Sequence, residues 1–236
     1  ASTPTWGMET VVITGASRGI GAAIAREYGE HGDRVVCCAR SKDALDAVAS
    51  DVREAGGEAI VQRADVRDEY DMERLMETAA REGGEVDTLF ANAGVYHGAP
   101  GETPLAEESY SAFDEHTQVN GRGVFAAIRE ALPHLADDAR LLVPSGSIAR
   151  DASAGFGSYA ASKAFAEALV RQFAAELEYP TAVVDPGQVS SELTNGMQGR
   201  DPDDVAPMFR WAATETDPEE IDGAVLSLRD WKSATR

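Results

Sequence analysis

The chain has 236 residues, of which 43% are hydrophobic and 26% charged. These proportions are those of an ordinary globular protein, and they exclude a disordered or collagen-like chain. The formal net charge of −20, from 41 acidic and 21 basic residues, argues against nucleic acid as a partner, because a basic patch would lie in a strongly repulsive field.

Short β-branched runs alternate with longer amphipathic stretches, which predicts βαβ units on a parallel sheet. The expected strands are Thr10–Thr14, Arg34–Ala39, Glu58–Arg63, Val86–Ala91, Arg140–Pro144, Thr181–Asp185 and Ala224–Leu228. The expected helices are Gly19–His31, Asp43–Ala55, Tyr70–Arg81, two within Ala106–Ala136, Tyr159–Leu177 and Asp201–Thr214. No repeat or low-complexity tract is present, so we expect one domain over residues 1–236. Its class is α/β: a Rossmann-type, doubly wound, three-layer sandwich with a mainly parallel seven-stranded sheet.

A glycine-rich segment joins the first expected strand to the first expected helix. It reads Thr14-Gly15-Ala16-Ser17-Arg18-Gly19-Ile20-Gly21. Glycines here let the backbone turn tightly and approach a pyrophosphate, whose charge is favoured at the N-terminus of the following helix. The segment therefore predicts a dinucleotide site; the alternative is a plain tight turn.

The end of the second expected strand distinguishes between dinucleotides. NAD sites place an acidic side chain there to bond the ribose 2′-OH. This sequence has Ala39, Arg40 and Ser41 instead, and Arg18 of the glycine loop can reach the same place. Guanidinium groups bind a 2′-phosphate through charge-assisted hydrogen bonds, so we expect NADP(H) as the cofactor. The alternative is that Arg40 is only a solvated charge at a strand end.

Tyr159 and Lys163 lie four residues apart near the start of an expected helix, so both project from one face. A nearby ammonium favours the phenolate and lowers the tyrosine pKa, which suits acid–base chemistry. The pair alone has little meaning, but it occurs with several other motifs. Together with the glycine loop, Asn92-Ala93-Gly94, Asn120, a serine cluster after the fifth strand and Pro186-Gly187, it resembles the short-chain dehydrogenase/reductase family over about Val11 to Leu228.

The resemblance implies hydride transfer between NADP(H) and a small-molecule carbonyl or secondary alcohol. Tyr159 would exchange a proton with the substrate oxygen, and Lys163 would lower the tyrosine pKa and bond the nicotinamide ribose. Asn120 would hold a water that links Lys163 to solvent. The family's cofactor contacts are carried over to Asp65 and Val66 at the adenine, to Asn92, Ala93 and Gly94 along the cofactor, and to Pro186, Gly187 and Val189 at the carboxamide.

The catalytic serine has two candidates. The segment reads Pro144-Ser145-Gly146-Ser147-Ile148-Ala149, whereas the family often has two adjacent serines. Aligning Ser147-Ile148-Ala149 with the family's Ser-x-Ala makes Ser147 the residue that polarises the carbonyl. Its spacing to Tyr159 is then one residue tighter than is common. Ser145 is the alternative.

The remaining expectations concern partners. Three histidines, His31, His116 and His134, lack ligand spacing, so we expect no metal site. Relatives often have a Gly-Gly turn where this chain has Arg229-Asp230-Trp231, in a region that commonly builds subunit contacts; we expect a homodimer or homotetramer. The rival function is a non-catalytic NADP(H)-binding sensor or scaffold, and the presence of both Tyr159 and Lys163 favours the enzyme.

Cysteine usage and charge predict the environment. The only cysteines, Cys37 and Cys38, are adjacent in an apolar run, which indicates packed thiols in a reducing cytoplasm. No apolar run approaches the roughly 18 residues needed to cross a bilayer, and residues 1–8 contain no basic, apolar leader, so we expect no membrane association. At ~1 M salt a Debye length of about 3 Å would remove the self-repulsion, which favours a halophilic protein over an ordinary acidic one.

Overall fold

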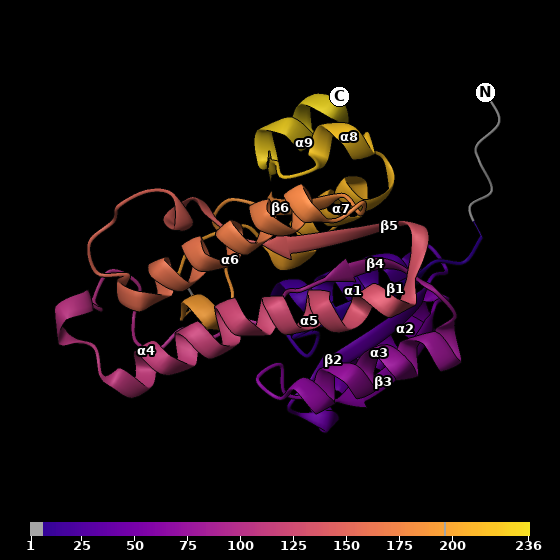
Figure 1. Ribbon diagram of the computed structural model, residues 1–236, viewed down its shortest axis with the longest axis horizontal. Helices are drawn as coiled ribbons and strands as arrows, with labels where there is room; N and C mark the ends of the chain where they lie inside the picture. Colours follow the sequence, from indigo (N-terminus) through magenta and orange to yellow (C-terminus); the bar gives the residue numbers. More distant parts are fainter. Residues whose placement is uncertain (1–6, 196) are drawn as a thin grey trace.

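The computed structural model describes residues 7–195 and 197–236, and its centre is a seven-stranded sheet (Figure 1). The strands are β1 (Thr10–Thr14), β2 (Arg34–Ala39), β3 (Glu58–Arg63), β4 (Val86–Phe90), β5 (Leu135–Pro144), β6 (Thr181–Asp185) and β7 (Val225–Ser227). Their order is β3-β2-β1-β4-β5-β6-β7, and every neighbouring pair is parallel. The predicted Rossmann-type sheet is confirmed, and it is parallel throughout.

Helices cover both faces of the sheet. One layer contains α1 (Gly19–Glu30), α2 (Lys42–Ala55) and α7 (Pro202–Thr214), and the other contains α3 (Glu69–Gly83), α5 (Gly123–Ala131) and α6 (Gly157–Glu176). The short helices are α4 (Tyr110–His116), α8 (Pro218–Ile221) and α9 (Leu228–Ala234). Along β1, Val11 and Ile13 pack into the first layer and Val12 into the second. A strand buried on both faces has no polar positions to alternate, which is why β1 reads as a continuous apolar run.

The order of the strands determines where in the sheet the site lies. From β1 the chain winds outward to β3, then returns to β4 on the other side of β1. The crevice beyond the carboxyl ends of β1 and β4 is the switch point at which doubly wound sheets bind ligands. The glycine loop follows β1 and Asn92 follows β4, so the predicted cofactor segments meet at this crevice.

The two helices expected within Ala106–Ala136 are present as α4 and α5, but the stretch is less regular than predicted and ends earlier. It contains a 3₁₀ turn at Leu105–Glu107, helix α4, a π-helical turn at Thr117–Arg122, helix α5 and a second 3₁₀ turn at Leu132–His134. Strand β5 then begins at Leu135, five residues before the expected Arg140. The sequence pattern does not predict this early start for two reasons. Asp137 and Asp138 are exposed within the strand, and the register of β5 against β4 shifts between Val86 and Thr88.

The expectations about the N-terminus and about membranes can be compared only with the described residues. Residues 1–6, which belong to the segment expected to lack a leader, lie outside the described part of the chain. Within residues 7–195 and 197–236, no helix combines the length and apolarity that crossing a bilayer demands.

Candidate active site

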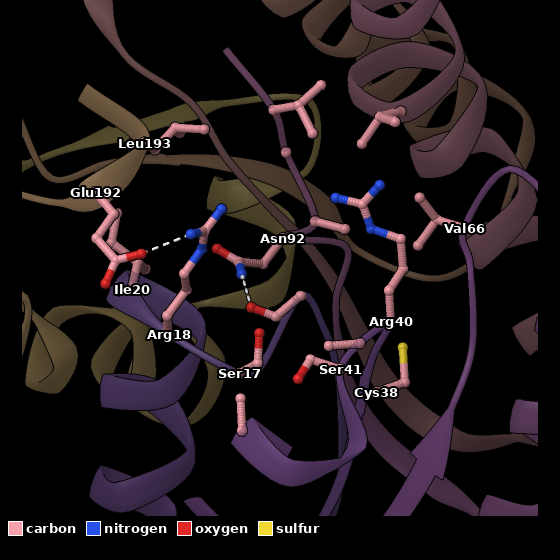
Figure 2. Close-up of a pocket in the computed structure, with 18 of the residues that line it drawn as sticks. Ser17, Arg18, Ile20, Cys38, Arg40, Ser41, Val66, Asn92, Glu192 and Leu193 are labelled. Atoms are coloured by element: carbon pink, nitrogen blue, oxygen red, sulfur yellow. Dashed lines mark hydrogen bonds and ion pairs between the residues drawn. The ribbon is translucent and has the colours of Figure 1, made fainter. Parts of the chain in front are cut away.

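A pocket of about 560 Å³ opens at the carboxyl ends of β1, β2 and β4 (Figure 2). Twelve of the predicted cofactor residues line it: Gly15, Ser17, Arg18, Gly19, Ile20, Arg40, Ser41, Asp65, Val66, Asn92, Ala93 and Gly94. The lining also includes nine residues outside that predicted set, namely Cys38, Ala39, Ala44, Ala64, Val95, Val119, Ser191, Glu192 and Leu193. Gly21, Pro186, Gly187, Val189 and the four catalytic candidates lie outside this lining.

The glycine loop is held against the segment after β4. Gly15 has a φ of +67°, and a Cβ on it would lie 2.7 Å from the Ala93 Cα. A Cβ on Gly21 would lie 2.3 Å from the Gly15 carbonyl oxygen, so Gly21 acts by close packing rather than by lining the pocket. Asn92 Nδ2 donates to the carbonyls of Thr14 and Gly15 at 3.0 and 3.2 Å. These contacts fix the glycine loop against the segment after β4.

The first turn of α1 offers unpaired donors to the pocket. Within the described residues, no side chain caps this N-terminus, and its first turn contains no acidic residue. Free N–H groups and the positive end of a helix dipole bind phosphate groups. Together with the glycine cradle, the residues present fit the pyrophosphate of a dinucleotide.

Both arginines predicted for a 2′-phosphate line the pocket, but each is paired with a carboxylate. Arg18 Nη1 lies 2.5 Å from Glu192 Oε2, and Figure 2 shows this pair beside the glycine loop. Arg40 Nη1 lies 3.8 Å from Glu115 Oε1. Neither glutamate is predicted from the sequence, because each lies far along the chain from the arginine that it contacts. Exposed pairs of this kind contribute little, so a bound phosphate can replace them.

Asp65 is itself held by an arginine. Its carboxylate accepts from Arg67 Nη2 at 2.6 Å and from the Arg67 backbone N–H at 3.0 Å. The hydrogen bonds from Arg67 lower the pKa of the Asp65 carboxyl. Asp65 therefore presents a fixed, ionised group at the pocket wall.

Tyr159 and Lys163 lie one turn apart on α6, as predicted. Lys163 Nζ donates to the Pro144 carbonyl at 2.7 Å, and the Tyr96 ring centroid lies 4.5 Å from that of Tyr159. Burial raises the pKa of Tyr159 to about 12 and lowers the pKa of Lys163 to about 8. The expected lowering of the tyrosine pKa by Lys163 is absent from this state, because desolvation dominates and the lysine bonds a carbonyl instead.

Asn120 lies in the π-helical turn and is almost fully buried. Its Oδ1 accepts from Val95 N at 2.8 Å, and its Nδ2 donates to Val95 O at 3.0 Å and to Ser162 Oγ at 2.9 Å. The π turn thus ties the segment after Asn92-Ala93-Gly94 to helix α6. Single π turns within helices are frequent at functional sites, and nothing in the local sequence announces this one.

The two serine candidates have different environments. Ser147 is exposed and begins a 3₁₀ turn, Ser147–Ala149. The Ser145 N–H donates to the Val184 carbonyl at 3.0 Å, and its Oγ is buried without a hydrogen-bond partner among the described residues. In that same part of the chain, neither hydroxyl is hydrogen-bonded to the Tyr159 phenol. Both serines follow β5 at the edge of the sheet that carries the site.

The Pro186-Gly187 segment follows β6 at the same edge. Gly187 has a φ of +72°, and its N–H donates to Asp185 Oδ1 at 2.9 Å. Val189 is buried and forms a bridge with Arg200. The segment is therefore anchored from both sides, although its residues do not line the described pocket.

A buried histidine that the sequence did not assign lies beside Tyr159. His116 Nε2 accepts from His97 N at 3.0 Å, and its Nδ1 lies 2.7 Å from Ser158 Oγ. Burial lowers the pKa of His116, so the ring is neutral near pH 7. His97 Nε2 lies 3.0 Å from Glu115 Oε2. Across the described ranges, no group of three or more His, Cys, Asp or Glu side chains is arranged to hold a metal ion.

Comparison with known proteins agrees with this geometry. The model of the family described as short chain dehydrogenase matches residues 9–201. The chain is 37% identical to the short chain dehydrogenase/reductase AacuN of Aspergillus aculeatus over 168 residues, which cover 70% of this chain and 62% of that relative. A dehydrogenase/reductase from Sinorhizobium meliloti superimposes with a TM-score of 0.84 at 30% identity over 94% of both chains. The alcohol dehydrogenase of Thermococcus sibiricus, solved with 5-hydroxy-NADP, gives 0.83 at 29% identity, over 94% of this chain and 96% of that one. This chain belongs to the short-chain dehydrogenase/reductase family.

Proposed function

We propose that this chain is an NADP(H)-dependent oxidoreductase that interconverts a carbonyl group and a secondary alcohol on a small molecule. Family membership supplies the oxidoreductase class. One observation carries the finer proposal. A pocket of about 560 Å³ with two arginines in its wall lies at the same sheet edge as Tyr159 and Lys163, which share one face of α6.

The bound cofactor supplies or accepts the hydride. Tyr159 gives its proton to the substrate oxygen in the reduction and takes it back in the oxidation. Lys163 stabilises the phenolate, and Asn120 connects this pair to solvent. Ser147 donates a hydrogen bond to the substrate oxygen as charge develops on it, with Ser145 as the alternative donor.

The preference for NADP(H) is supported by charge. Arg18 and Arg40 line the pocket, and each is more than half exposed, so each is free to turn toward a phosphate. A planar guanidinium binds phosphate through two parallel hydrogen bonds. The relative from Thermococcus sibiricus was solved with an NADP derivative, which is consistent with this assignment.

Assembly and environment are part of the proposal. Several large apolar side chains are exposed on α4, α5 and α6: Tyr110 at 89%, Phe113 at 45%, Phe125 at 39% and Phe165 at 42%. A homodimer or homotetramer would cover such side chains. We retain the cytoplasmic, high-salt environment as a prediction; unfolding scans from 0.1 to 3 M KCl test it, since a halophilic protein gains stability with salt.

The test follows NADPH absorbance in concentrated KCl with a panel of ketones, aldehydes and quinones. Turnover of any member supports the enzyme, and binding of NADPH without turnover favours the sensor or scaffold. With a turned-over substrate, Tyr159→Phe is expected to lower kcat by about 10²-fold or more and to leave NADPH affinity nearly unchanged. The control is Tyr70→Phe, at an exposed position on α3. A Tyr159→Phe protein with half the original activity would refute the assignment.

A further inference from the structure

Arg150 follows directly after the serine segment and closes its turn. The backbone N–H of Arg150 donates to the Ser147 carbonyl at 2.8 Å. The side chain is 35% exposed and points its guanidinium toward two carboxylates from other elements. No motif in the sequence marks this arginine as part of the site.

The two carboxylates are buried. Arg150 Nη1 lies 2.5 Å from Glu167 Oε1, and Arg150 Nη2 is paired with Asp185 Oδ2. The side chain of Glu167 is 2% exposed and that of Asp185 is 10% exposed. A buried carboxylate is costly unless a partner compensates its charge, so removal of the guanidinium would take from both anions the cation with which they are paired.

Each carboxylate adjoins a segment of the proposed site. Glu167 lies one turn after Lys163 on α6, and Asp185 ends β6 and accepts from the Gly187 N–H. Arg150 itself follows Ser147. One guanidinium therefore joins the serine segment, the tyrosine–lysine helix and the Pro186-Gly187 segment.

The same groups set the electrostatics around Lys163. Burial lowers the pKa of Lys163, and the Glu167 and Asp185 carboxylates oppose that effect. Among the described residues, Tyr96 and His116 contact the Tyr159 ring, and Glu108 accepts from the neighbouring Ser158 N–H. Lys163 and Arg150 carry two positive charges, and Glu167 and Asp185 carry two negative charges. The cluster is neutral only while Arg150 is present.

We propose that Arg150 is a positioning residue: it holds the three segments of the site in one arrangement and balances the two carboxylates beside Lys163. The inference rests on the proposed function, because it assigns Tyr159 and Lys163 the proton transfer. It predicts a signature in the pH dependence that a merely structural role would not produce.

The experiment measures kcat for alcohol oxidation against pH with the best substrate of the panel. Oxidation needs the Tyr159 phenolate, so its rate rises with pH. Arg150→Gln leaves two anions near the pair, which disfavours the phenolate; we expect the rising limb to move to higher pH by about 0.5–1 pH unit, a roughly three- to tenfold loss at a fixed pH below the limb. Glu167→Gln removes one anion, so the limb moves to lower pH.

The double variant is the decisive arm. Arg150→Gln/Glu167→Gln removes one charge of each sign, and its limb should return close to that of the original protein. Arg150→Lys keeps the charge and should also retain the original limb. The matched control is Arg129→Gln, which removes an exposed arginine paired with Glu130 on α5 and should change nothing.

A second readout is independent of turnover. Because Arg150 anchors the Pro186-Gly187 segment through Asp185, we expect Arg150→Gln to weaken binding of the preferred nucleotide, NADPH or NADH, about fivefold by fluorescence titration. If Arg150→Gln does not fold, Arg150→Lys and Glu167→Gln carry the test.

The two proposals fail in different ways. The role of Arg150 is overturned if the rising limb of the kcat–pH profile does not move in Arg150→Gln, or if it moves in the same direction in Arg150→Gln and Glu167→Gln. Either result leaves the proposed oxidoreductase activity standing. Absence of turnover refutes the proposed function, and unchanged nucleotide affinity in Arg150→Gln then also overturns the positioning role.

Discussion

The two halves of the site are held together by different forces. On the cofactor side, the glycine loop and the segment after β4 are joined by amide and hydroxyl hydrogen bonds, and the arginines of this side are 58% and 54% exposed. On the catalytic side, the connections run through charges: Arg150, itself 35% exposed, meets the buried carboxylates of Glu167 and Asp185, and Lys163 donates to the Pro144 carbonyl.

This difference separates affinity from rate. Neutral hydrogen bonds around a glycine cradle do not titrate, so the binding half keeps its shape over a wide pH range. Charges removed from water respond to every neighbouring charge, because the local dielectric screens them weakly. Substitutions on the cofactor side should therefore change mainly nucleotide affinity, and substitutions on the catalytic side should change mainly kcat and its pH dependence. Arg150 should change both, because it also anchors the Pro186-Gly187 segment through Asp185.

The largest effect is expected from Lys163→Met, which breaks the catalytic half. The variant removes the cation beside Tyr159 and leaves Glu167 and Asp185 facing one arginine, so the phenolate loses its stabilisation. We expect kcat to fall by about 10³-fold. Steady-state kinetics measure the fall, and Lys232→Met on α9 is the exposed control. A loss of less than about tenfold would contradict the role of Lys163.

The next largest effect on kcat is expected from one of the two serine candidates on the catalytic side. Ser147→Ala removes the proposed hydrogen bond to the substrate oxygen, and we expect a fall in kcat of about 10²-fold. Ser145→Ala should cost far less activity, and Ser153→Ala at an exposed position should cost none. If Ser145→Ala shows the larger loss instead, the buried Oγ of Ser145 is the catalytic hydroxyl.

Arg40→Ala tests the cofactor half. Loss of a charge-assisted contact to the 2′-phosphate should lower kcat/KM for NADPH by about 10- to 100-fold and leave NADH unaffected. The two cofactors are compared with one substrate, and Arg81→Ala on α3 serves as the control because its side chain is exposed beside Glu82. An equal loss with both cofactors would show that Arg40 does not read the phosphate.

The sequence predicts the fold where local and tertiary preferences agree. Strands β1, β2, β3 and β6 have the expected bounds, because each is a short, β-branched run followed by a turn or loop signal. The early start of β5 escaped prediction because Asp137 and Asp138 lie where the register against β4 shifts, between the pairs Val86–Leu135 and Thr88–Arg140. The π turn around Asn120 depends on packing between helices, which no local pattern encodes.

The residues of the site also fall into those that can be predicted from the sequence and those that cannot. Motifs that adjoin the ends of strands, such as the glycine loop and Asn92, are readable because the fold fixes where those ends meet. Glu115, Glu192 and Arg150 matter through partners far along the chain, so only the folded structure pairs them. The pKa of Tyr159 could not be predicted from the sequence either. The spacing of the two residues places Lys163 near Tyr159, but burial decides whether the tyrosine pKa rises or falls.

The smallest effect is expected far from the site. It tests whether a buried charge changes kcat only when it lies close to the proposed catalytic residues. Glu9 precedes β1 at the opposite edge of the sheet; burial, with Asp33 and Asp87 nearby, raises its pKa to about 7. The folded state therefore binds the proton more tightly than the unfolded state. Stability from this group is complete below about pH 4.5 and is lost as the pH rises through about 7.

Glu9→Gln mimics the protonated side chain, so the variant should match the original protein at low pH and exceed it at high pH. Because Glu9 is only partly buried, we expect a gain in Tm of about 1–2 °C at pH 8 and none at pH 4.5. Glu73→Gln, on the exposed face of α3, should show no such trend. Among the described residues, Glu9 contacts none of the proposed catalytic groups, so kcat and its pH profile should stay unchanged. A shifted profile would mean that buried charges act across the whole sheet, and the separation of the two halves would fail.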